Sequence, residues 1–155
     1  MMKKSMIFLW FLGVVFPLSA AAQTSLVRFE GGIGSQPLRS GPAVNVVQGV
    51  NPGGQPWVIS RLSVDVKLDG RISVDGRGLL LGGGNGIGTT GGQSVRARLF
   101  CGGVAFDSDL APLEPNGDFR IEGILSAIPG FPCANPVLLI VSVGGNWFAA
   151  GIPKL

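Results

Sequence analysis

The feature that most constrains the fold is a strict alternation of apolar and polar residues between Arg61 and Gly70. The apolar positions of this stretch are Leu62, Val64, Val66 and Leu68. Because successive side chains of a β-strand point to opposite faces, this period of two places all four on one face. Asp-Gly pairs follow at 69–70 and 75–76, and such a pair between alternating runs is a strong hairpin signal. The sequence therefore predicts a hairpin of strands at 57–68 and 71–74, with one buried apolar face and one solvent-exposed polar face.

The remainder of the chain has the composition of a protein built from strands and turns. It contains 26 glycines and 11 prolines in 155 residues, and no stretch keeps an apolar helical stripe free of both for three turns. Further short strands are predicted at 26–30, 44–50, 79–81, 94–101, 118–125, 137–143 and 147–152. The segment 137–141 is apolar throughout, which is typical of a strand buried on both faces. About seven to nine short strands predict one all-β domain at 23–155, an antiparallel β-sandwich or alternatively a small β-barrel.

Residues 1–22 have the pattern of a cleaved secretory signal peptide. Lys3 and Lys4 precede an apolar run from Met6 to Leu18, and small residues end the segment at Ala22. The apolar run is shorter than the roughly 20 residues of a membrane-spanning helix. We therefore expect a secreted or periplasmic protein with no transmembrane segment in its mature chain.

Export changes what the charge and the cysteines imply. Removing residues 1–22 takes away Lys3 and Lys4, so the formal net charge falls from +3 to +1. This near balance gives no electrostatic reason to expect a nucleic-acid partner. The chain has two cysteines, Cys101 and Cys133. Because disulfides persist in oxidising compartments, these two are predicted to pair.

The absence of histidine excludes several kinds of catalytic site. Without it, a chain has no Ser-His-Asp triad, no Cys-His dyad and no histidine-ligated zinc. The sequence therefore predicts a non-catalytic protein. A hydrolase that uses a pair of carboxylates is the enzymatic alternative, although nothing in the sequence brings a particular pair together.

A cluster of oxygen-bearing side chains lies between 107 and 118. Its candidate metal ligands are Asp107, Asp109, Glu114, Asn116 and Asp118. Calcium is held by six to eight oxygen ligands, often carboxylates, so this cluster is a candidate calcium site. The alternative is a solvated loop, and no other cofactor is expected.

A glycine-rich segment at 82–92 contains a formal match to the G-x-G-x-x-G motif at 86–91. A dinucleotide site needs this motif between a strand and a helix. Here the residues that follow, 95–99, alternate like a strand. The segment is therefore predicted to be a flexible surface loop.

Trp57 and Trp147 are the two tryptophans that follow the signal peptide, and amide side chains lie close to them in sequence. Gln55 precedes the first by two residues, and Asn146 directly precedes the second. A tryptophan beside amides can stack on a sugar ring, which makes these four residues candidates for ligand binding. The alternative is that each tryptophan closes one end of the apolar core.

Arg96 and Arg98 project from the same face of one predicted strand. Two guanidinium groups on one face can clamp a phosphate or a carboxylate. Alternatively, they form a solvated face paired with acids such as Glu122 or Asp118.

These observations favour an exported, non-catalytic β-sandwich that acts through its surface, as a cell-envelope, adhesion or matrix component. Its partner would be another surface or a glycan. The alternative is a secreted glycan- or small-ligand-binding module, and the carboxylate-dependent hydrolase is a third hypothesis.

Overall fold

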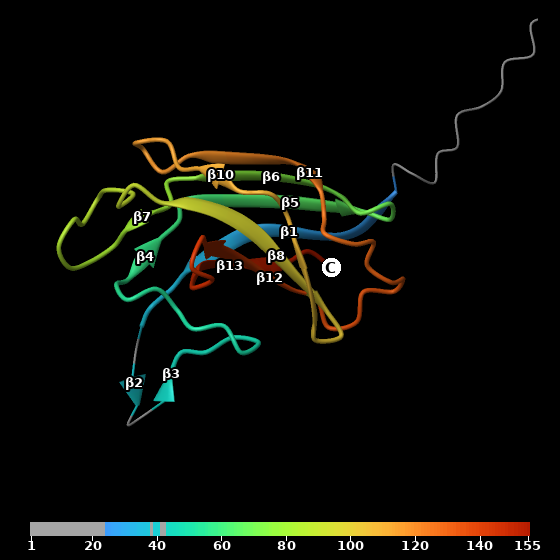
Figure 1. The fold of residues 1–155 in the computed structure, drawn as a ribbon, viewed down its shortest axis with the longest axis horizontal. Coiled ribbons are helices and arrows are strands. Elements are labelled where there is room, and N and C mark those ends of the chain that lie inside the picture. The colour runs from blue at the N-terminus through green and yellow to red at the C-terminus, as the bar shows by residue number, and fades with distance from the viewer. Residues whose placement is uncertain (1–23, 38, 41–42) are drawn as a thin grey trace, which may run out of the picture.

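The computed structural model describes residues 24–37, 39–40 and 43–155, and this part of the chain is all-β (Figure 1). The predicted signal peptide at 1–22 lies outside the described residues. No helix occurs in the described part, so it holds no helix that is long and apolar enough to cross a membrane.

The described strands form one large antiparallel sheet and two small ribbons. The strands are β1 (Ser25–Gly34), β2 (Arg39–Ser40), β3 (Ala43–Val44), β4 (Trp57–Val58), β5 (Arg61–Lys67), β6 (Arg71–Arg77), β7 (Leu80–Leu81), β8 (Ser94–Cys101), β9 (Val104–Asp107), β10 (Ala111–Pro112), β11 (Phe119–Ile124), β12 (Val137–Ser142) and β13 (Trp147–Pro153). The large sheet has the order β10-β8-β12-β13-β1-β5-β6-β11, with β9 also paired to β8, while β2 pairs with β3 and β4 with β7. The sheet curls into a half-barrel, so that β8 crosses in front of β1 and β5 in Figure 1. The predicted sandwich is thus one continuous sheet whose two halves face each other across the core.

The predicted hairpin is the pair β5 and β6. Leu62, Val64 and Val66 are buried in the main core, as the alternation predicts. The two strands pair directly, for example Val64 with Val74. Gly70 completes the turn with a positive φ of 86°, a conformation that glycine adopts without steric cost.

The continuously apolar segment forms β12, which lies between β8 and β13 and is buried on both faces, as predicted. Leu138 and Ile140 belong to the main core. Leu139 and Val141 point the other way, into a second apolar cluster. The buried members of this outer cluster are Val50, Phe100, Leu139, Val141 and Trp147.

The predicted strand at 44–50 is wrong beyond Val44. Val47 and Val50 instead exchange two backbone hydrogen bonds across a tight turn, at 3.0 and 2.8 Å. Gln48 and Gly49 both take positive φ, which turns the chain back on itself. This turn packs Val50 into the outer cluster, so the segment covers the outward face of β12.

The disulfide between Cys101 and Cys133 is present, as predicted, and spans 32 residues of sequence. It joins the end of β8 to the loop that precedes β12. The backbone N–H of Gly102 donates to the carbonyl of Ala134 beside it, at 2.6 Å. The loop before β12 is therefore fixed to the β8–β9 hairpin at two points.

Candidate functional site

The turn between β12 and β13, residues 143–146, lies between two hollows on the surface. We call the first the amide pocket. It has a volume of about 350 Å³ and is lined by Gly53, Gly54, Gln55, Trp57, Leu81, Asn85, Gly91, Gln93, Ser142, Asn146 and Phe148. Three of the four residues predicted to bind a ligand, Gln55, Trp57 and Asn146, therefore come together here.

The floor of the amide pocket is an aromatic pair held by the backbone of Ser35. The rings of Trp57 and Phe148 are stacked, with centroids 4.0 Å apart. Ser35 donates its N–H to the carbonyl of Phe148 at 2.8 Å and accepts the N–H of Trp57 at 2.9 Å. Gly34 passes directly against the Trp57 carbonyl, where a Cβ atom would overlap the backbone. The close approach of β1 to β4 thus sets the position of both rings.

Trp57 presents an edge to the pocket, because its ring is stacked and only 3% exposed. Its Nε1–H has no hydrogen-bond acceptor among the described residues. Gly53 lies over this edge, and a Cβ there would stand 2.9 Å from Nε1. Trp57 can therefore offer a ligand a hydrogen-bond donor, but it has no open face on which a sugar ring could stack.

Trp147 lies elsewhere and does not line the amide pocket. It is 4% exposed, belongs to the outer cluster, and donates Nε1–H to the carbonyl of Asn45 at 3.1 Å. Its surroundings fit the alternative drawn from the sequence, in which tryptophan closes an apolar core.

The glycine-rich loop at 82–92 forms one wall of the amide pocket. Gly82 donates its N–H to the carbonyl of Pro56 at 2.8 Å, which anchors the loop beside Gln55. Gly84 lies against the Gln55 amide, where a Cβ would stand 3.2 Å from Cδ. The Gln55 Oε1 is buried here without a hydrogen-bond donor. An unpaired buried carbonyl costs about 1–3 kcal/mol, so a donor that reached it would be bound favourably.

No charged side chain lines the amide pocket. Besides Gln55, its polar groups are the amides of Asn85, Gln93 and Asn146 and the hydroxyl of Ser142. Amides and hydroxyls both donate and accept hydrogen bonds, and alcohols need both. The pocket therefore matches an uncharged ligand that is rich in hydroxyl groups.

We call the second hollow the arginine pocket. It has a volume of about 460 Å³ and is lined by Gly49, Val50, Asn51, Arg96, Arg98, Ser142, Val143, Gly144, Gly145 and Asn146. The two arginines face Asp107, and not Glu122 or Asp118 as the sequence suggested. Arg98 binds Asp107 through two bonds of 2.7 and 2.8 Å, and Arg96 lies 3.9 Å from the same carboxylate. The hydrogen bonds that Arg98 donates to Asp107 raise the pKa of Arg98 against the opposing effect of burial.

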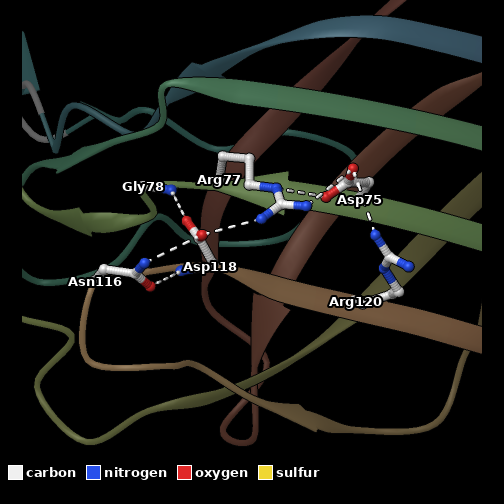
Figure 2. A network of polar contacts seen from close by, with 6 residues as sticks. All are labelled: Asp75, Arg77, Gly78, Asn116, Asp118 and Arg120. Carbon is white, nitrogen blue, oxygen red and sulfur yellow. Dashed lines mark hydrogen bonds and ion pairs between the residues drawn. The ribbon is translucent and has the colours of Figure 1, made fainter.

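The five predicted calcium ligands do not come together, and three of them lie in two separate hydrogen-bonding environments. Asp107 is held by Arg98, whereas Asn116 and Asp118 belong to a network at the end of β6 (Figure 2). In that network Asp118 accepts the N–H of Gly78 at 3.0 Å and binds Arg77 at 3.1 Å. The bond from Gly78, together with those from Arg77 and Asn116, lowers the pKa of Asp118 below its ordinary value.

The geometry of these acids does not favour a calcium site. Among the described residues, no three histidine, cysteine, aspartate or glutamate side chains gather into a group that could hold a metal. Glu114 is exposed on the turn beside Asp118, and Asp109 is exposed beyond the end of β9. The calcium site stays a prediction from the sequence, and so does a catalytic pair of carboxylates.

A further hollow of about 430 Å³ lies on the outward face of β5, β6 and β11. Its charged groups have partners close by: Lys67 binds Asp65 at 2.8 Å, Ser73 donates to Glu122 at 2.7 Å, and Arg71 binds Asp69 at 2.8 Å. Burial acts to raise the pKa of Asp65, but hydrogen bonds from Lys67 and Ser25 outweigh it, and the pKa is lowered. The charged groups that line this hollow are thus already paired.

Sequence reasoning did not select Asn85, Gln93, Ser142 or Phe148 as parts of a site. The signal that was available is the pair of amides in and directly after the glycine-rich segment at 82–92, Asn85 and Gln93.

The chain was compared with protein-family models, curated proteins and solved structures, and none of the three comparisons found a match.

Proposed function

We propose that the protein is a non-catalytic binding module whose ligand is a saccharide held in the amide pocket. The observation that carries the proposal is the convergence of four amide side chains on one uncharged hollow, beside the free N–H of Trp57. Ligand pockets commonly combine an apolar or aromatic surface with a few well-placed polar groups.

Saccharides are favoured over other uncharged ligands because of the balance of groups in the pocket. A sugar hydroxyl both donates and accepts hydrogen bonds. The side-chain amides of Gln55, Asn85 and Asn146 can do the same, since each has an NH₂ donor and a carbonyl acceptor. The Trp57 Nε1–H supplies one further donor, and Phe148 and Leu81 supply the apolar contact that sugar C–H groups need.

The signal-peptide pattern at 1–22 supports an exported location for this module, and the disulfide is compatible with a secreted or periplasmic compartment. An exported saccharide-binding module fits the broader hypothesis of a protein that acts through its surface on a glycan or an envelope.

The test is calorimetric titration of the purified protein with a panel of neutral oligosaccharides. Gln55→Ala and Asn146→Ala each remove hydrogen bonds to the ligand and should weaken binding about tenfold. Gln36→Ala is the matched control, because its side chain is exposed outside the pocket. Circular dichroism should show that all three variants keep the fold.

Two results would overturn the proposal. One is that no oligosaccharide in the panel binds. The other is that Gln55→Ala and Asn146→Ala bind as tightly as Gln36→Ala.

A further inference from the structure

The two hollows described above share part of their lining. Ser142 and Asn146 belong to both the amide pocket and the arginine pocket. Asn146 is exposed where the β12–β13 turn closes, and it is hydrogen-bonded to the buried Ser142 at the end of β12. A ligand that spans this turn would contact both hollows at once.

The arginine pocket carries a positive charge that its own residues do not neutralise. Two guanidinium groups face the single carboxylate of Asp107, and no acidic side chain lines the hollow. Arg98 uses two of its N–H groups on Asp107, at 2.7 and 2.8 Å. Arg96 has only a distant contact of 3.9 Å with that carboxylate, which leaves its donors available.

The position of Arg96 strengthens its interaction with an anion. Its side chain is 29% exposed, compared with 64% for Arg120 on the opposite half of the sheet. A charge that is partly removed from water interacts more strongly with a partner than an exposed one. Gly144 and Gly145 line the hollow without side chains, so an anionic group can approach closely.

Ser142 adds a donor between the two hollows. Its Oγ accepts the N–H of Asn146 at 3.2 Å, and its own O–H has no acceptor among the described residues. A hydroxyl in this position can donate either to the sugar or to its charged substituent.

We propose that the ligand is an acidic saccharide, whose uncharged ring occupies the amide pocket and whose carboxylate or sulfate group binds Arg96 in the arginine pocket. This inference rests on the function proposed above, and it specifies the class of saccharide.

The experiment compares binding of oligosaccharides in matched pairs. Each uronate is paired with its methyl ester, and each sulfated sugar with its desulfated form, so that only the charge changes within a pair. The native protein should bind the charged member about tenfold more tightly at low salt. This preference should shrink as the salt concentration rises, because salt screens the charges.

Arg96→Gln should remove the preference while leaving binding of the uncharged members unchanged. Arg120→Gln changes the net charge by the same amount at a distant position, and it should retain the preference. The uronate and sulfate arms show which anionic group the pocket takes.

The outcomes separate the two proposals. If the uncharged members bind and the charged ones bind no more tightly, the acidic saccharide is ruled out and the proposed function stands. If Arg120→Gln reduces the preference as much as Arg96→Gln, the effect is one of overall charge and the site is ruled out. If neither member of any pair binds, both proposals fail.

Discussion

The two halves of the curled sheet differ in what lies on their outward faces. On β5, β6 and β11 the outward side chains are polar except for Ile124, and several of them pair with one another in water, as Asp75 and Arg77 do (Figure 2). On β12 and β13 the outward side chains are apolar, and residues 47–52 cover them. The covered half carries both pockets of the candidate site. The segment that covers β12 and β13 therefore brings glycines and amide side chains to that half of the sheet. On the uncovered half, the polar side chains mostly bond to one another.

The largest expected effect is at the junction that positions the covered half. Gly34→Ala would force a Cβ atom into the Trp57 carbonyl and separate β1 from β4. We expect the free energy of unfolding to fall by roughly 4 kcal/mol. Chemical denaturation followed by circular dichroism measures this change. Gly54→Ala is the control, because a Cβ there meets nothing within 4 Å, and its stability should match that of the native protein.

A direct comparison of the two outward faces gives the next largest effect. Leu139 is fully buried on the outward face of β12, so Leu139→Ala should lower the free energy of unfolding by roughly 3 kcal/mol. Ser73 lies on the polar face of β6 and donates to Glu122 at 2.7 Å, in contact with water. Ser73→Ala should cost less than about 1 kcal/mol. Equal losses in urea denaturation would mean that the two faces do not differ as described.

The smallest expected effect is a change in how stability depends on pH, and it comes from Asp118 on the polar half of the sheet. The pKa of Asp118 is lowered in the folded state. Its carboxylate therefore contributes to the free energy of unfolding above the ordinary aspartate pKa of about 4. That contribution is lost as the pH falls through the lower pKa of the folded protein. Asp118→Asn keeps an acceptor for Gly78 but cannot titrate, so its stability should fall less steeply from about pH 5 to about pH 2.

Urea denaturation at a series of pH values measures this slope. Asp109→Asn is the matched control, because the Asp109 carboxylate has no hydrogen bond or ion pair among the described residues. The role given to Asp118 is contradicted if both variants have the same slope.

The parts of the fold that the sequence predicted depend on local patterns. The alternation at 61–69 is sufficient to define a strand with one buried face, and the uninterrupted apolar run at 137–141 is sufficient to define a central one. The pairing of Cys101 with Cys133 followed from the number of cysteines and the expected compartment. In each of these cases the deciding information lies within the segment itself or in the composition.

Two errors came from turns that were overlooked. Gly49 takes a positive φ of 76° and reverses the chain where a strand was expected. Gly102 and Gly103 both take positive φ in the tight connection from β8 to β9, and β9 was not predicted. A Gly-Gly pair between two strands is a known hairpin signal, so β9 was within reach of sequence reasoning.

The site was less predictable because it depends on contacts between distant segments. Asn51 accepts the N–H of Trp147 at 2.9 Å, and this contact brings Gly53 and Gln55 to the β12–β13 turn. No local pattern encodes that pairing. Trp57 was selected for its ring face, yet the stacking of Phe148 leaves only its edge for binding.

The position of β1 in the sheet makes its pairing depend on both early and late parts of the described chain. β1 lies between β5 and β13, and Ile33 pairs with Ala150 near the other end of the chain. Contacts between residues so far apart in sequence form slowly, since a long loop must close first. A ribosome makes β13 after every other described strand, so β1 can pair with β5 before it can pair with β13. One edge of β1 therefore stays open to other strands until β13 has been made.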